Sequence, residues 1–194
     1  MRLSNLRGIS LTLRNIVKLL DNQSIPYMLI GGLALPTYGQ IRATQDIDMA
    51  IAANFEDSSK FQAELKKAGF QLASPPHPDA PVFVVTDLKQ MVEIEIWTKP
   101  DGVSFDQALL DSRWKVQPFE DDPSFSIFVI GPEDFIVNKL ARSDRRAQDE
   151  TDAASVIARQ SGKLDQKYLW KRAKAAGVKE LLDEIVRRIQ ETKR

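Results

Sequence analysis

The sequence contains no cysteine and a single histidine among its 194 residues. Without cysteine the chain can have neither a disulfide framework nor a thiolate metal site, and one histidine argues against a zinc centre built on imidazole. Any metal bound by this protein is therefore expected to have oxygen ligands.

The sequence also lacks an excess of either charge, with 27 basic and 27 acidic residues. No overall field marks it as a protein that coats nucleic acid or an anionic membrane, so any nucleic-acid contact should be local. No stretch approaches the roughly 20 apolar residues of a membrane span, and residues 1–10 lack the apolar stretch of a signal peptide. We expect a cytoplasmic protein with no membrane association.

Hydrophobic periodicity divides the chain into short elements. It predicts helices over residues 11–20, 33–38, 55–69, 133–159 and 168–194, strands over 27–30, 46–51, 81–86, 90–98 and 125–130, and a proline-containing loop over 74–81. The first helix should end before Asp21, and the strands 81–86 and 90–98 should form an antiparallel hairpin.

This order of elements predicts an α/β (α+β) fold. We expect a mixed sheet of about four or five strands flanked by helices, followed by a helical C-terminal region. The predicted domains are 1–130, which includes the N-terminal helix, and 131–194, which packs on it.

Two aspartates mark the segment that carries chemistry. Asp46 and Asp48 lie two apart on a predicted strand, so both project from one face. Carboxylates this close repel each other unless a cation lies between them, and magnesium favours carboxylate oxygens, water and substrate phosphates. By itself, an Asp-x-Asp pair can also be an ordinary solvated face.

A glycine pair precedes this strand. Gly31 and Gly32 follow the strand 27–30 and precede the helix 33–38. Glycine lets backbone N–H groups come close to a phosphate, and the start of a helix adds a favourable dipole. A tight packing turn is the alternative interpretation, and the order and spacing of glycines and aspartates favour a phosphate site.

With these residues in place, the sequence resembles the nucleotidyltransferase superfamily that includes DNA polymerase beta, and most closely the bacterial branch related to the AbiEii toxins of abortive-infection toxin–antitoxin systems. The resemblance spans roughly residues 27–157. It rests on a set of short motifs: Gly31-Gly32, Arg42-x-Thr44-x-Asp46-x-Asp48, a later acidic strand, and Lys139 followed by Arg145, Asp149 and Asp152.

The resemblance implies that Asp46 and Asp48 bind Mg²⁺ (or Mn²⁺) and that a third carboxylate on a neighbouring strand activates the attacking hydroxyl. Glu93 and Glu95 are the candidates, and they share a face. We favour Glu95, because the segment Ile94-Glu95-Ile96-Trp97, followed downstream by Phe105-Asp106, resembles the place where the family has its third aspartate. The family has aspartate there, and an extra methylene can cost about a hundredfold in rate if it misplaces the carboxylate.

Further residues have two interpretations each. Lys139 either binds the triphosphate, as the resemblance implies, or extends its ammonium group past the helix end into water. Asp149 can orient Lys139 or Arg145 at the site, whereas Asp152 is better explained by a surface ion-pair cluster. Arg42 and Thr44 can hold phosphate oxygens or fasten the loop.

The resulting prediction is transfer of a nucleotidyl group from a nucleoside triphosphate to a hydroxyl acceptor, either a transfer RNA or a protein, within a toxin–antitoxin system that supplies a cognate partner. One alternative is a non-catalytic antitoxin or interaction module with the same fold. Another is a small-molecule enzyme like the aminoglycoside nucleotidyltransferases.

Overall fold

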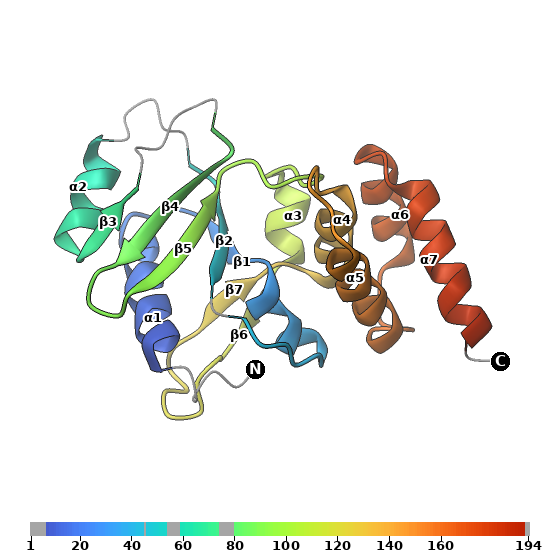
Figure 1. Cartoon of the computed structure of the whole chain (residues 1–194), viewed down its shortest axis with the longest axis horizontal. Helices are drawn as coiled ribbons and strands as arrows, with labels where there is room; N and C mark the ends of the chain where they lie inside the picture. The colour runs from blue at the N-terminus through green and yellow to red at the C-terminus, as the bar shows by residue number, and fades with distance from the viewer. Residues whose placement is uncertain (1–6, 45, 54–58, 74–79, 193–194) are drawn as a thin grey trace.

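The computed structural model describes residues 7–44, 46–53, 59–73 and 80–192. In these residues a seven-stranded sheet lies at one end of the molecule and a group of helices at the other (Figure 1). The strands are β1 (Tyr27–Leu29), β2 (Ile47–Ile51), β3 (Phe70–Leu72), β4 (Val82–Asp87), β5 (Val92–Trp97), β6 (Trp114–Val116) and β7 (Ile127–Val129). The helices are α1 (Arg7–Asn22), the 3-10 helix η1 (Gly32–Tyr38), α2 (Ser59–Lys67), α3 (Gln107–Ser112), α4 (Pro132–Ala141), α5 (Ala147–Arg159), α6 (Gln166–Ala175) and α7 (Lys179–Thr192).

The sheet is mixed, with the strand order β3-β4-β5-β2-β1-β7-β6. β2 runs parallel to β5 and antiparallel to β1, while β1 runs parallel to β7. The two outer pairs, β3 with β4 and β6 with β7, are antiparallel. β2 therefore lies between the glycine turn that follows β1 and the acidic strand β5.

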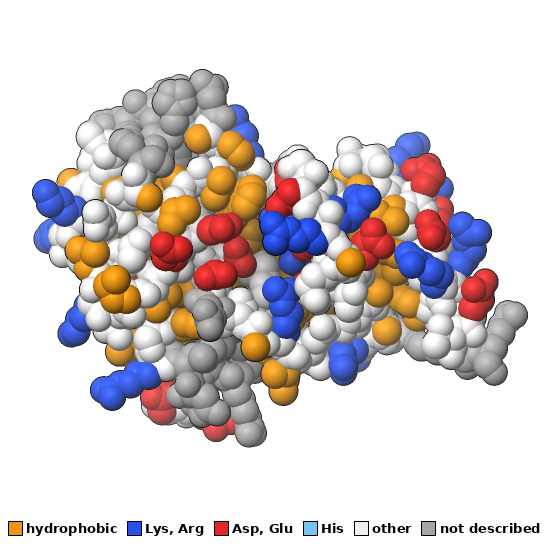
Figure 2. Space-filling model, in the orientation of Figure 1, with side chains coloured by type: hydrophobic (Ala, Val, Ile, Leu, Met, Phe, Trp, Pro, Cys, Tyr) orange, Lys and Arg blue, Asp and Glu red, His pale blue; other side chains and the backbone are white. Residues whose placement is uncertain are grey.

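The two faces of β5 differ in character. Ile94 and Ile96 are fully buried in the core, on the side where α1 packs, whereas Glu95 and Trp97 alternate onto the opposite face and are partly exposed. In Figure 2 this opposite face carries acidic side chains next to hydrophobic ones. A strand with one buried face produces this alternation, so the acidic residues of β5 are left available for chemistry.

The C-terminal helices are joined to the sheet through η1. α5 packs against η1 and α4, and the side-chain amide of Gln160 donates a hydrogen bond to the carbonyl of Tyr38 at 3.0 Å. The Tyr38 ring packs against Phe135 of α4, with ring centroids 5.2 Å apart, and its hydroxyl donates to the carbonyl of Ile130. Residues on either side of position 131 thus form one continuous core.

The expected α/β class is confirmed, and so is the antiparallel hairpin of β4 and β5. The predicted number of strands was too low. β3 and β6 were missed because they are short and largely exposed, unlike the equally short but buried strands β1 and β7. The helix α3 was missed because its six residues include one buried apolar residue, Leu109, which gives no helical period. The first helix does not end before Asp21 but continues to Asn22. The buried side chains of Leu19 and Leu20 hold its last turn in place, and that turn includes the two polar residues.

Within the described residues, no helix is both long enough and apolar enough to cross a membrane. The start of the helix predicted over 55–69 and most of the loop predicted over 74–81 lie outside the described residues. The division into domains 1–130 and 131–194 stays a prediction.

Candidate active site

The parallel pairing of β2 with β5 brings two acidic side chains together. Asp48 lies directly opposite Glu95, and Ile47 lies opposite Ile94. Asp48 and Glu95 therefore leave the same face of the sheet at the same level. Glu93 lies one pleat earlier, where it pairs with Thr86 of β4 and lines a hollow together with Asp46.

Gly31 lies against the Asp48 carboxylate. Its φ of 64° is in the left-handed region, which favours glycine, and the Ile30 N–H donates to the Asp48 carbonyl at 2.9 Å. A Cβ atom at Gly31 would be 1.9 Å from Oδ2 of Asp48, so no side chain fits between the turn and the carboxylate. Glycine at this position thus lets the turn lie directly against the carboxylate.

Negative charge accumulates around Asp48. Its pKa is raised from 3.8 to about 6, first by burial and then by the carboxylates of Glu95 and Asp46. Lys139 and Arg142 act in the opposite direction. The site thus brings acidic groups from β2 and β5 within electrostatic reach of basic groups from α4 and the segment after it, and Figure 2 shows acidic and basic side chains meeting at this junction.

The residues between η1 and β2 are fixed on both sides. Gly32 lies so close to Thr44 that an added Cβ would be 3.1 Å from the threonine Oγ1. The guanidinium of Arg42 bonds to Asp152 of α5 at 2.6 Å. Arg42 therefore does fasten its loop, to a helix 110 residues further along the chain. Gly31 caps a seven-residue 3-10 helix that begins at Gly32. Because this element is not an α-helix, the predicted helix dipole is weak here.

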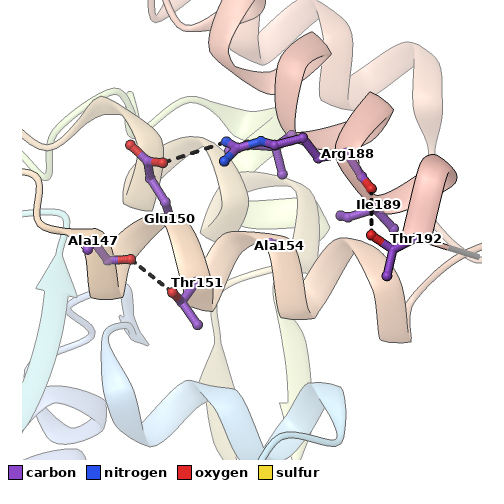
Figure 3. Close-up of a pocket in the computed structure, with 8 residues that line it drawn as sticks. Ala147, Glu150, Thr151, Ala154, Arg188, Ile189 and Thr192 are labelled. Atoms are coloured by element: carbon purple, nitrogen blue, oxygen red, sulfur yellow. Dashed lines mark hydrogen bonds and ion pairs between the residues drawn. The ribbon is translucent and has the colours of Figure 1, made fainter.

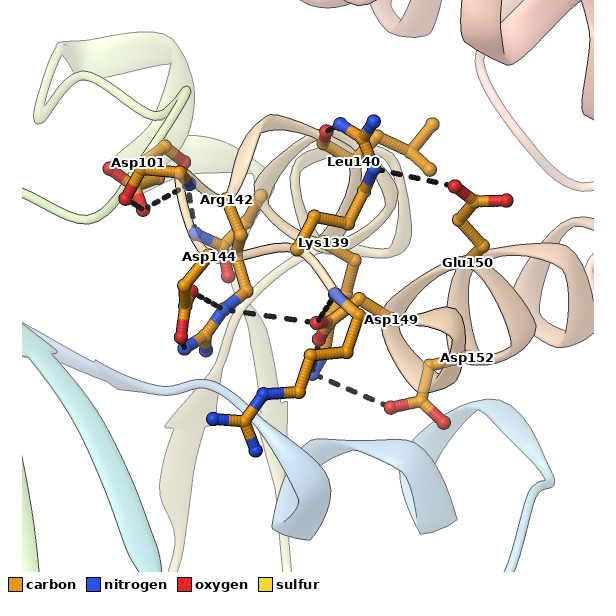
Figure 4. A network of polar contacts seen from close by, with 12 residues as sticks. Asp101, Lys139, Leu140, Arg142, Asp144, Asp149, Glu150 and Asp152 are labelled. Atoms are coloured by element: carbon orange, nitrogen blue, oxygen red, sulfur yellow. Dashed lines mark hydrogen bonds and ion pairs between the residues drawn. The ribbon is translucent and has the colours of Figure 1, made fainter.

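Lys139 is buried and paired, as Figure 4 shows. Its ammonium group is 2.9 Å from Asp149 and 3.4 Å from Asp152, and only 6% of its side chain is exposed. The alternative in which this ammonium group extends into water is therefore wrong. Burial by itself would raise the pKa of Asp149, but hydrogen bonds from Lys139 and from the backbone N–H of Arg146 hold that pKa below its usual range.

The interpretation of Asp152 as a surface residue is also wrong. Asp152 is fully buried and bonds to Arg42, Lys139 and Gln148. A carboxylate buried to this extent needs such partners to offset its desolvation. The i, i+3 spacing on α5 was visible in the sequence, but the burial of that helix face against η1 and α4 was not.

Arg142 is a candidate that the sequence did not single out. It follows the last residue of α4 and makes a two-pronged contact with Asp144, at 2.9 and 3.2 Å. Its guanidinium lies 5.8 Å from the centre of the Trp97 ring and is one of the two cations acting on Asp48. The spacing of Arg142 from Lys139 was the available signal, since residues three apart share a helix face.

The donor set suits a hard cation. Asp46, Asp48 and Glu95 offer only oxygen atoms, which magnesium and manganese accept, and the backbone of Gly31 lies directly against the Asp48 carboxylate. Among the described residues, no three acidic or histidine side chains are already gathered into a formed metal site. A metal ion would therefore be completed by other oxygens, such as those of phosphates.

A separate hollow between α5 and α7 has no comparable chemistry (Figure 3). Glu150 and Arg188 form an ion pair across it at 3.7 Å, and the hydroxyls of Thr151 and Thr192 donate to backbone carbonyls of their own helices. Its remaining lining is mostly apolar: Ala147, Ala154, Ile185 and Ile189. Its polar groups are thus satisfied within the protein.

Solved structures share this fold. The structure of the lincosamide antibiotic adenylyltransferase LnuA bound to lincomycin matches with a TM-score of 0.51 and 18% identity, over 74% of this chain and 93% of that one. The solution structure of the antibiotic-resistance factor ANT(2'')-Ia matches with a TM-score of 0.52 and 12% identity, over 93% and 94%. An antigenic nucleotidyltransferase-like protein from Paracoccidioides brasiliensis matches with a TM-score of 0.50 and 19% identity, over 91% of each chain. At such identities the likeness establishes the nucleotidyltransferase fold.

The family described as nucleotidyl transferase of unknown function (DUF2204) matches residues 9–191, and the chain belongs to this family. The protein is therefore an enzyme of the nucleotidyltransferase class. No curated protein gave a significant match.

Proposed function

We propose that this enzyme transfers a nucleotidyl group from a nucleoside triphosphate to a hydroxyl acceptor in a reaction that depends on Mg²⁺ or Mn²⁺. The observation that carries the proposal is the side-chain-free turn at Gly31 against Asp48, which faces Glu95 across the β2–β5 pair. Oxygen ligands for a metal and a turn without a side chain, whose backbone a phosphate can approach, meet at this place.

In this proposal each residue has a defined task. Asp46, Asp48 and Glu95 would hold the metal, which would supply positive charge that offsets the charge of the phosphates. Gly31 and Gly32 bring backbone N–H groups to the triphosphate.

Lys139, oriented by Asp149, gives a fixed positive charge to the leaving pyrophosphate. Thr44 supplies a further donor to the phosphate oxygens, and so does Arg42 through N–H groups other than the one that bonds to Asp152. Glu95 takes the proton of the acceptor hydroxyl as its oxygen bonds to the α-phosphorus and the bond to pyrophosphate breaks.

For the acceptor we propose a transfer RNA or a protein hydroxyl, in the cytoplasm, with the enzyme acting in an AbiEii-type toxin–antitoxin pair that includes a cognate partner. The motifs from Gly31 to Asp152 support this choice. A small hydroxylated molecule is the second candidate. The lincosamide antibiotic adenylyltransferase LnuA and the antibiotic-resistance factor ANT(2'')-Ia have the same fold.

The deciding experiment is label transfer. The protein is incubated with magnesium, a cell extract and each α-³²P-labelled triphosphate in turn, with Asp48→Asn as the control, and the labelled product is separated into RNA, protein and small-molecule fractions. Label in one fraction that depends on Asp48 identifies the acceptor class. Triphosphate binding with no labelled product in any fraction would instead favour a non-catalytic interaction module.

A further inference from the structure

Two cations at the end of α4, Lys139 and Arg142, are held in very different ways. Lys139 is buried between Asp149 and Asp152, whose side chains are 10% and 0% exposed. Arg142 is held mainly by Asp144, whose side chain is 54% exposed. A charge in a buried pair cannot leave without stranding its partner, whereas an exposed partner is readily solvated by water. Lys139 is therefore held in place, whereas Arg142 can exchange its carboxylate partner for another anion.

The other arginines around the site are less free. Arg42 is bonded to the fully buried Asp152, so its removal would leave a buried carboxylate with one partner fewer. Arg145 donates to the carbonyl of Leu140 at 2.7 Å and faces Glu150. Arg142, by contrast, lies 5.8 Å from the centre of the Trp97 ring on β5, beside the strand that carries Glu95.

We propose that Arg142 is a mobile phosphate ligand, which in the free enzyme is held by Asp144 and which binds the triphosphate when the nucleotide enters. This inference rests on the proposed function. The planar guanidinium presents the same pair of N–H donors to a phosphate as to a carboxylate, so the two-pronged contact with Asp144 can be exchanged for one with phosphate oxygens.

The position of Arg142 supports this role. It lies between the Trp97 ring on β5 and the Asp149 carboxylate on α5, whose Oδ2 is 4.0 Å from its Nε, and so it spans the junction of sheet and helices (Figure 4). A triphosphate seated between the glycine turn and Lys139 would pass this junction.

The test compares Arg142→Gln with Asp144→Asn, because the two variants break the same ion pair. Binding of magnesium tripolyphosphate and of each magnesium nucleoside triphosphate is measured by titration calorimetry, with Arg188→Gln on α7 as the control. We expect Arg142→Gln to weaken affinity tenfold or more. Asp144→Asn, which frees Arg142, should keep the affinity or raise it by a few-fold, and Arg188→Gln should leave it unchanged.

If Arg142 only fastens the segment after α4, Asp144→Asn will weaken binding as much as Arg142→Gln, and the proposal is overturned. Equal affinity of wild type and Arg142→Gln overturns it as well, while leaving the proposed function intact. A wild type that binds no magnesium triphosphate would contradict the proposed function itself. Circular dichroism and melting curves of both variants show whether a loss of binding comes from unfolding.

Discussion

Gly31 is the residue on which the geometry of the site depends most directly. Glycine is needed there for two reasons: the left-handed backbone conformation and the lack of space for a Cβ atom. Comparison with Gly69 separates the two effects. Gly69 has a φ of 89° but open space where a Cβ would be, whereas a Cβ at Gly31 would overlap Asp48. The two glycines therefore form a matched pair for substitution by alanine.

We expect Gly69→Ala to cost about 1–2 kcal/mol of stability from backbone strain alone. Gly31→Ala should cost about 1–3 kcal/mol more, because the overlap forces Asp48 to shift. It should also abolish magnesium–triphosphate binding. Urea denaturation and calorimetry measure the two effects, and equal costs for both variants would show that the turn does not press on Asp48.

Asp48 itself should make stability depend on pH. Its pKa of about 6 in the folded protein lies above the ordinary value of 3.8. Between these two pH values the folded protein therefore keeps a proton on Asp48 that the unfolded chain has released. This contribution to stability is complete below the unfolded value and is lost as pH rises through about 6. At pH 7.5 the ionised carboxylate therefore destabilises the metal-free fold, by up to about 3 kcal/mol.

Asp48→Asn should accordingly raise the melting temperature by several degrees at pH 7.5 in EDTA and have little effect at pH 4. Magnesium with a triphosphate should reverse the order at pH 7.5 by stabilising the wild type alone. A pH-independent difference between the proteins would contradict the raised pKa.

At the scale of elements, the pairing of β2 with β5 makes a prediction about two glutamates. Glu95 lies opposite Asp48, and Glu93 lies one pleat away on the same face. If Glu95 takes the proton from the hydroxyl group of the acceptor, Glu95→Gln should lower kcat by about a hundredfold or more and leave triphosphate affinity within a few-fold. Glu93→Gln is the matched control, and a larger loss with Glu93→Gln would move the third carboxylate there.

The contact of α5 with α4 and the segment before β2 depends on Asp152. Breaking a buried ion pair from one side costs about 3–5 kcal/mol, so Asp152→Asn should lower stability by about 3 kcal/mol. Glu150→Gln on the same helix serves as control and should change stability by less than about 0.5 kcal/mol, since its ion pairs with Arg145 and Arg188 are partly exposed. Similar values from urea denaturation would mean that the buried network contributes no more than a surface pair.

At the scale of the whole molecule, the sheet and the C-terminal helices share contacts through Tyr38, Gln160 and Phe135. We expect the two predicted domains to unfold together. Trp114 lies in β6 and Trp170 in α6, so variants that retain one of these tryptophans, with the others changed to phenylalanine, report on each half. Their urea curves should coincide. An earlier transition at Trp170 would show that the helical region unfolds independently.

Local pattern was enough to single out most residues of the candidate site in the sequence. A strand, two glycines and an Asp-x-Asp strand are short-range features, because side-chain direction repeats every two residues and backbone freedom belongs to single residues. The same holds for the alternation of Glu93, Glu95 and Trp97 onto one face, and for the helix that carries Lys139.

Tertiary structure decided the rest. The register of β2 against β5, which sets Glu95 beside Asp48, depends on how the buried faces pack and on no local signal. The partners of Lys139 and Arg42 come from α5, and Asp152 is 110 residues away from Arg42 in the chain. Arg142 gained its place at the site from the end of α4, where it meets Trp97 of β5. Periodicity fixes which way a side chain points along its own element, but only packing fixes what it meets there.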